Sequence, residues 1–229
     1  MSDFASNFSA TVFDEMGDLH LSTAAETPLR SGALELSDEE KMRRISAHFA
    51  EIMQILGLDL SDDSLRGTPR RVAKMYVKEI FRGLNPANKP HITTFENKYR
   101  YRRMLVERNI PVQSTCEHHF QPIFGVAHVA YIPNGRVIGL SKLNRIVDYY
   151  ARRPQVQERL TIQIAEELRR LLHTEDVAVY IDACHMCVQA RGVEHAGTST
   201  VTAEYSGKFL NEETKREFLM AIHARRPEQ

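Results

Sequence analysis

The first ninety residues contain two stretches in which apolar side chains recur at helical spacing. The first stretch carries them at Ile45, Phe49, Ile52, Met53 and Leu56. This period of three to four residues predicts an amphipathic helix with one buried face. We expect the helix to begin after Ser37, because Ser37 and Glu40 have the spacing of a capping box, and to end at Gly57.

A second helix is predicted from Thr68 to about Gly83, because Pro69 is favoured in a first helical turn. Its apolar side is formed by Val72, Met75, Tyr76 and Ile80. A different face carries the basic residues Arg71, Lys74 and Lys78. From its spacing alone, such a basic stripe is typical of a solvated surface.

Beyond residue 90 the pattern changes to one that is typical of strands. Strands are expected within residues 92–132, 176–190 and 199–205. Between them we expect a pair of helices, one with Ser141 as its N-cap and one over about residues 155–172, and Asn211 caps a final helix. Strands, a helix pair and further strands predict an α+β fold, with a largely antiparallel sheet and the helix pair packed on it.

The chain is therefore divided into three parts. Residues 1–36 form an N-terminal extension that is partly ordered, residues 37–90 a helical segment, and residues 91–229 the main α+β domain. Thirty basic residues balance thirty acidic ones, so no overall field favours nucleic acid or an anionic membrane. The acidic first thirty residues argue against a signal or transit peptide, and only three cysteines are present. These features predict a cytoplasmic protein.

The candidate chemistry lies in two short clusters, Cys116-Glu117-His118-His119 and His185-Met186-Cys187. Thiol and imidazole groups are the preferred ligands of zinc, and three protein ligands leave a coordination position open for water. Cys116, His119 and Cys187 give such an open site, provided that the chain turns between the first two. If the strand that begins near residue 176 continues past His185, then His185 and Cys187 share one face of it and Cys184 faces away.

Other interpretations of these clusters remain open. A closed, structural site would add Cys184 as a fourth ligand. The spacing of Cys184 and Cys187 is also that of a redox pair, but redox pairs precede a helix, and no helix start is predicted here. The combination of H-x-E with P-C-x-x-C that marks a cytidine deaminase is absent.

Several long motifs, in the same order, resemble the GTP cyclohydrolase I family. They are Ser114-Thr115-Cys116-Glu117-His118-His119, Ile138-Gly139-Leu140-Ser141-Lys142-Leu143-Asn144-Arg145, Arg153-Pro154-Gln155-Val156-Gln157-Glu158-Arg159-Leu160, His185-x-Cys187 and Arg191-Gly192. The resemblance runs from about Glu26 to the C-terminal helix. Cys184 departs from it, since a small apolar residue or threonine is expected there.

The resemblance implies an enzyme that hydrolyses the imidazole ring of GTP at C8, releases formate and forms 7,8-dihydroneopterin triphosphate. This is the first step of tetrahydrofolate biosynthesis. The implied cofactor is one zinc ion per subunit, on Cys116, His119 and Cys187. The implied fold of residues 91–229 is the tunnelling fold, and the implied assembly is a decamer of two pentamers with shared active sites.

The resemblance also assigns roles to individual residues. His185 is similar to the family's proton donor to N7 of guanine, and His118 to a second acid or base. Glu158 matches the carboxylate that accepts both N1–H and N2–H of guanine. The triphosphate contacts implied are Ser141, Lys142, Arg145, Arg191, Arg71 and Lys74. Arg71 and Lys74 would then bind phosphate and would not be part of a merely solvated surface. A protein that binds GTP without turnover, and a relative that acts on another purine or pterin, are the alternatives.

Overall fold

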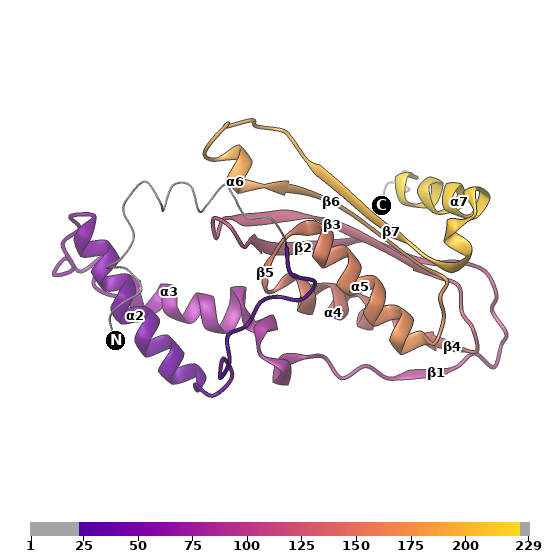
Figure 1. Ribbon diagram of the computed structural model, residues 1–229, viewed down its shortest axis with the longest axis horizontal. Helices are drawn as coiled ribbons and strands as arrows, with labels where there is room; N and C mark the ends of the chain where they lie inside the picture. The colour runs from indigo at the N-terminus through magenta and orange to yellow at the C-terminus, as the bar shows by residue number, and fades with distance from the viewer. Residues whose placement is uncertain (1–22, 225–229) are drawn as a thin grey trace.

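The computed structural model describes residues 23–224, with six α-helices and seven strands in them (Figure 1). The helices are α2 (Asp38–Ile55), α3 (Thr68–Met75), α4 (Leu140–Ala151), α5 (Gln157–Leu172), α6 (Met186–Gln189) and α7 (Glu212–His223). The strands are β1 (Thr94–Glu96), β2 (Leu105–Cys116), β3 (Pro122–Tyr131), β4 (Arg136–Ile138), β5 (Pro154–Gln155), β6 (Val177–His185) and β7 (Thr200–Tyr205). The first 22 residues of the expected N-terminal extension lie outside the described residues.

Two of the three predicted N-caps are confirmed. The side chain of Ser37 accepts a hydrogen bond from the amide of Glu40 at the start of α2, and Asn211 accepts from the amide of Glu213 at the start of α7. The prediction that Ser141 caps α4 is wrong. The cap is Gly139, whose extended backbone places its carbonyl 2.8 Å from the amide of Lys142. Helix α4 therefore begins before Ser141.

The N-terminal helical segment differs from its prediction in two places. The helix that begins at Thr68 is regular only to Met75 and continues as a π-helical turn over Tyr76–Ile80. On α2, Ile52 and Leu56 are 49% and 72% exposed, although the pattern placed them on the buried side. The apolar stripe therefore extends beyond the part of it that other residues of this chain cover.

The main sheet has five strands in the order β5-β2-β3-β6-β7. Its pairs are antiparallel except for the short parallel pair of β5 with the end of β2. Strands β1 and β4 form a separate antiparallel pair. In Figure 1 helices α4 and α5 lie together on one face of the sheet. This is the α+β arrangement that the sequence predicted, with a largely antiparallel sheet and a helix pair packed on it.

Each face of the sheet has its own hydrophobic cluster. The cluster under α4 and α5 includes alternate residues of β6 and the buried sides of both helices, among them Leu143, Ile146, Leu160, Ile164 and Leu168. The cluster on the opposite face lies under α7 and contains Ala130, Ala178, Phe209, Phe218 and Ile222. Successive strand residues point to opposite faces. The parity of a residue on β6 therefore decides which cluster it faces, and this fixes the surroundings of the site below.

A buried histidine, His128 on β3, lies on the face under α7. Its Nδ1 accepts a hydrogen bond from the amide of Asn109 at 3.4 Å. Burial is the main reason that its pKa lies below the usual 6.5, and His223 and Arg108 lower it further, against the opposing effect of Asp182. The Tyr180 ring, with its centroid 6.0 Å away, also packs against it.

This environment predicts a loss of stability in acid. Because the pKa of His128 is lower in the folded state, the unfolded chain binds more protons below pH 6.5. Stability is therefore retained above that pH and falls as the pH drops through 6.5 toward the folded-state pKa. We expect His128→Asn, which keeps an acceptor near Nδ1, to lose less stability than the unmodified protein between pH 7.5 and 5. Urea denaturation at both pH values measures this.

The matched control for that experiment is His195→Asn, since His195 is exposed in the segment between α6 and β7. It should keep the full acid-induced loss. An equal loss in both variants would exclude His128 as a source of the pH dependence.

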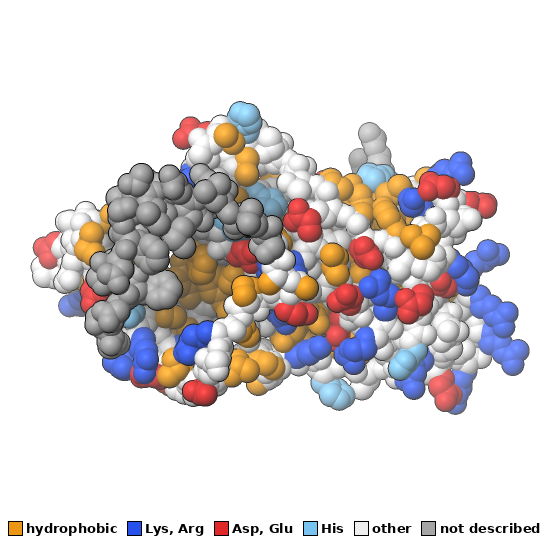
Figure 2. All heavy atoms as spheres, in the orientation of Figure 1, with side chains coloured by type: hydrophobic (Ala, Val, Ile, Leu, Met, Phe, Trp, Pro, Cys, Tyr) orange, Lys and Arg blue, Asp and Glu red, His pale blue; other side chains and the backbone are white. Residues whose placement is uncertain are grey.

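The face shown in Figure 2 has no single dominant character. On the face shown in Figure 2, acidic and basic side chains are interspersed, in agreement with the balanced charge of the chain. Among the helices of residues 23–224, none combines the length and apolar character needed to cross a membrane.

Candidate metal centre

The first cluster forms the connection between β2 and β3. Cys116 is the last residue of β2, and the chain turns back so that the amide of Phe120 donates to the Cys116 carbonyl at 2.9 Å. The Cys116 amide donates to the Gln121 carbonyl at 2.8 Å, and Phe120 adopts a left-handed backbone with φ +52°. This is the turn that the sequence required between Cys116 and His119.

The second cluster is built differently from its prediction. Strand β6 ends at His185, and Cys187 lies on the short helix α6. The expectation that the strand continues to Cys187, and that no helix start follows Cys184, is therefore wrong. Cys187 nevertheless packs against the cluster under α4 and α5, which contains the alternate β6 residue Ala183. Cys184 has the opposite parity on β6 and belongs to the other face.

Cys116, His119 and Cys187 come together as a group whose ligand atoms all lie within 4.8 Å of one another. Two thiols and one imidazole at this separation suit zinc, which binds sulfur and nitrogen ligands tetrahedrally. Within residues 23–224 Cys184 is not part of the group, which favours a three-ligand site over a closed one. Burial, followed by the neighbouring Cys116 thiol, raises the pKa of Cys187, and a bound cation would reverse this effect.

His185 lies next to this group and is held by a buried side chain. Its Nε2 is 2.7 Å from Oε1 of Gln157, the first residue of α5. The Gln157 amide nitrogen donates to the carbonyl oxygens of Ile181 and Thr200 at 3.2 and 2.8 Å. Two carbonyl acceptors fix the orientation of the Gln157 amide, so its oxygen faces His185 and the His185 Nε2 carries the proton. Burial lowers the pKa of His185, and Glu158 partly opposes this.

His118 and Glu158 line one cavity of about 580 Å³. Its walls are the start of α5 and the N-terminal residues Thr23 to Glu26, which cross in front of α5 in Figure 1. Glu158 is exposed in the first turn of α5. The predicted catalytic histidines, the predicted guanine-binding carboxylate and the candidate metal ligands therefore lie in one region.

The remaining predicted residues do not all join this region. Arg191, in the segment after α6, is close enough to Cys187 to lower its pKa against the effect of burial. Ser141, Lys142 and Arg145 lie in the first half of α4. The other end of α4 leads to β5, which pairs with Cys116. The phosphate candidates on α4 thus lie at the opposite end of that helix from the metal group.

The two predicted residues on α3 have local contacts only. Arg71 donates to the Ser64 carbonyl and the Thr68 hydroxyl, each at 3.0 Å, and Lys74 lines a surface hollow together with residues of α2. The described contacts bring neither residue to the metal group within this chain.

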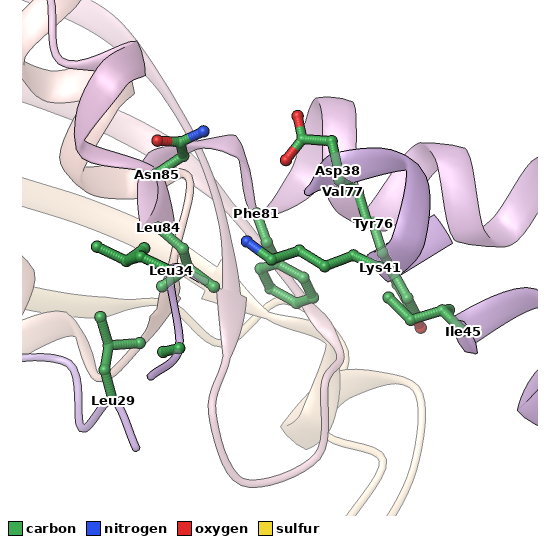
Figure 3. Close-up of a pocket in the computed structure, with 11 residues that line it drawn as sticks. Leu29, Leu34, Asp38, Lys41, Ile45, Tyr76, Val77, Phe81, Leu84 and Asn85 are labelled. Atoms are coloured by element: carbon green, nitrogen blue, oxygen red, sulfur yellow. The ribbon is translucent and has the colours of Figure 1, made fainter. Parts of the chain in front are cut away.

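A separate apolar groove of about 200 Å³ lies between residues 29–34, α2 and the π-helical turn (Figure 3). Leu29, Leu34, Phe81 and Leu84 point into it, and its charged lining residues are Asp38 and Lys41. Because Asp38 is already paired with Lys78 at 2.7 Å, the groove offers packing surface and little acid–base chemistry.

Two residues near the metal group were missed by sequence reasoning, although both lie within the matched motifs. Gln157 orients His185 as described above. Arg159 forms a bidentate ion pair with Glu117, the residue between the first two candidate ligands. Only a weak indication that Arg159 is buried is present in the sequence, namely its position next to the apolar Leu160 in the helical pattern of α5.

Comparisons with known proteins show the family of this chain. A profile of the GTP cyclohydrolase I family matches residues 45–223. A protein of Flavobacterium johnsoniae named GTP cyclohydrolase 1 is 62% identical over 206 residues, which cover 90% of this chain and 92% of that protein. Proteins of the same name from Citrobacter koseri and Erwinia tasmaniensis are 56% and 51% identical, covering 86% and 94% of this chain and 89% and 100% of their own lengths. The chain belongs to the GTP cyclohydrolase I family.

Proposed function

We propose that this protein hydrolyses GTP at C8 of guanine, releases formate and forms 7,8-dihydroneopterin triphosphate at the Cys116, His119 and Cys187 group. The observation that carries this proposal is the position of that group beside two histidines and a carboxylate. Family membership supplies the reaction, which is the first step of tetrahydrofolate biosynthesis.

The proposed cofactor is zinc, one ion per subunit. Cys116, His119 and Cys187 would hold it with three ligands and leave one position open. When bound there, zinc supplies an activated water at neutral pH. The three cysteines are free thiols, as ligand cysteines must be, and a reducing cytoplasm is the compartment that keeps them so.

The proposed acid–base groups are His185 and His118. His185 donates a proton to N7 of guanine, which makes the ring electrophilic at C8. Because its Nε2–H is committed to Gln157, the proton that His185 donates is the one that Nδ1 carries in the imidazolium form, and the ring is left neutral after the transfer. His118, adjacent to the ligand His119, acts as the second acid or base in ring opening. Imidazole suits both roles because it titrates near neutral pH.

Glu158 is the proposed recognition group for guanine, since one carboxylate can accept both N1–H and N2–H. We expect Glu158→Gln to lower kcat/KM for GTP by about tenfold or more, because an unpaired buried donor costs roughly 1–3 kcal/mol. The glutamine NH₂ would also face a guanine donor. Steady-state kinetics with GTP measure the effect.

Glu166→Gln is the matched control, since Glu166 lines the same cavity two turns later on α5. It should leave kcat/KM within about threefold, because surface changes of this kind usually stay within ±0.5 kcal/mol. If both variants lose the same activity, Glu158 has no special role in recognising guanine.

The triphosphate is assigned to Ser141, Lys142, Arg145, Arg191, Arg71 and Lys74. Ser141 and Lys142 lie in the first turn of α4, where the helix dipole favours an anion. Since this end of α4 is remote from the metal group of the same chain, we propose that a neighbouring subunit completes each site. The proposed assembly is a decamer of two pentamers. The exposed Ile52, Ile55 and Leu56 provide apolar surface for such contacts.

The test of the proposed function is to incubate zinc-loaded protein with GTP and to follow formate and the fluorescence of the oxidised pterin. ATP, which lacks the guanine donor edge, serves as the control nucleotide. We expect formate and pterin from GTP alone. Binding of GTP without formate would identify a binding protein, and turnover of another purine instead of GTP would place the substrate elsewhere.

A further inference from the structure

The Arg159 guanidinium is buried, with 4% of the residue exposed, and has a defined partner for each of its nitrogens. Its Nη1 and Nη2 donate to the two carboxylate oxygens of Glu117 at 2.7 and 3.0 Å. Its Nε donates to the Ala24 carbonyl at 2.8 Å. Arg159 therefore ties together three separate segments: α5, the turn between β2 and β3, and the N-terminal residues beside the cavity.

The position of Glu117 makes this ion pair significant. Glu117 lies between Cys116 and the turn residues that carry His119, and its amide donates to the Gln155 carbonyl at 3.1 Å. Its Oε1 is also 3.9 Å from Nε2 of His118. The carboxylate is therefore part of the short segment that presents two candidate metal ligands and one candidate acid or base.

A free carboxylate in this segment would compete for the metal. Carboxylate oxygen is an ordinary zinc ligand, and a fourth protein ligand would close the position that a catalytic site keeps for water. In the structure the Glu117 oxygens are not among the grouped ligand atoms of the described residues. Both of them are engaged by Arg159, whose planar fork matches a carboxylate in a way that lysine cannot.

We propose that Arg159 is a positioning residue that holds the Glu117 carboxylate out of the metal coordination sphere. In doing so it preserves the open position and fixes the turn from Cys116 to His119. The kinetic part of this inference rests on the proposed function, whereas the coordination part does not. Arg159 also lines the cavity that His118 and Glu158 share, but the role proposed for it is exerted through Glu117.

The test compares Arg159→Lys, Glu117→Gln and the double variant, each with cobalt(II) in place of zinc. Cobalt absorption in the visible range reports the number and geometry of ligands without any substrate. In Arg159→Lys we expect weaker cobalt bands, as in a higher coordination number, and a kcat for GTP that is about 10–100-fold lower. KM should stay within about threefold, since guanine recognition is retained.

The double variant distinguishes this role from a merely structural one. A glutamine amide at residue 117 is a poor zinc ligand, so adding Glu117→Gln to Arg159→Lys should restore the original cobalt spectrum. Arg169→Lys is the matched control. Arg169 lies on the same helix, α5, as Arg159 and also forms an ion pair, with Glu204 at 3.4 Å. It should change neither the spectrum nor kcat.

The proposal is overturned if Arg159→Lys keeps the original cobalt spectrum or keeps kcat within threefold. It is equally overturned if the double variant retains the altered spectrum. Should Arg159→Lys fail to fold, Glu117→Asp takes its place, since the shorter carboxylate cannot keep both bonds to the guanidinium, and the same spectral change is expected. If the unmodified protein releases no formate, the proposed function fails, but the cobalt comparison still decides the role of Arg159.

Discussion

Replacing Cys187 with alanine is expected to abolish stoichiometric zinc binding and to lower formate release from GTP by about a thousandfold. Three ligands are the minimum found in catalytic zinc sites, and Cys187 supplies one of the two thiols in the group. A metal contributes several kcal/mol of transition-state stabilisation, and about 1.4 kcal/mol corresponds to a factor of ten. Zinc content by atomic absorption and formate release together measure the effect.

The matched control is Cys184→Ala, three positions earlier. On β6 the side chain of Cys184 points to the opposite face from that of His185, and Cys184 is outside the ligand group of the described residues. We expect this variant to retain one zinc per chain and full activity. Loss of zinc in Cys184→Ala would mean that the site has four ligands, and it would contradict the open coordination on which the proposed reaction depends.

The second large effect is expected from His185→Ala, which should lower kcat by about 10²–10⁴-fold, the usual contribution of a positioned acid or base. The Gln157 network holds the His185 ring with its Nε2 proton directed at a fixed amide oxygen. Removing the ring leaves the Gln157 amide held by the Ile181 and Thr200 carbonyls and removes the proton donor. Zinc content should therefore remain one per chain, while kcat falls.

His195→Ala provides the comparison, since His195 is exposed in the segment that follows α6. Its kcat should match that of the unmodified protein. If His185→Ala retains kcat within threefold, another group protonates N7, and His118 becomes the residue to test.

Local signals predicted much of the fold. The caps at Ser37 and Asn211 depend on side chains and amides only a few residues apart, so the sequence displays them directly. The strand pattern of β6 can likewise be read from the sequence. Its alternate residues pack against two different clusters in the structure. The metal group was predicted from residue chemistry, and the turn at Cys116 lies where the spacing required it.

The errors occurred at element boundaries that no side-chain pattern marks, and where the partner of a residue lies far along the chain. Nothing in Cys184-His185-Met186-Cys187 indicates that the strand stops at His185, yet α6 begins at Met186. At α4 the extended backbone of Gly139 supplies the cap that a serine pattern suggested for Ser141. The role of Arg159 depends on Glu117, 42 positions away. Periodicity along one element cannot reveal such a partner.

The two ends of α4 have a consequence for how activity depends on protein concentration. The helix has 12 residues and so spans roughly 18 Å at about 1.5 Å per residue, with the metal turn near one end and the phosphate candidates at the other. In the proposed assembly, zinc retention belongs to the single chain, whereas catalysis belongs to the contact between chains. On dilution the zinc content per chain should therefore stay constant. The activity per chain should fall, because the assembly dissociates by mass action.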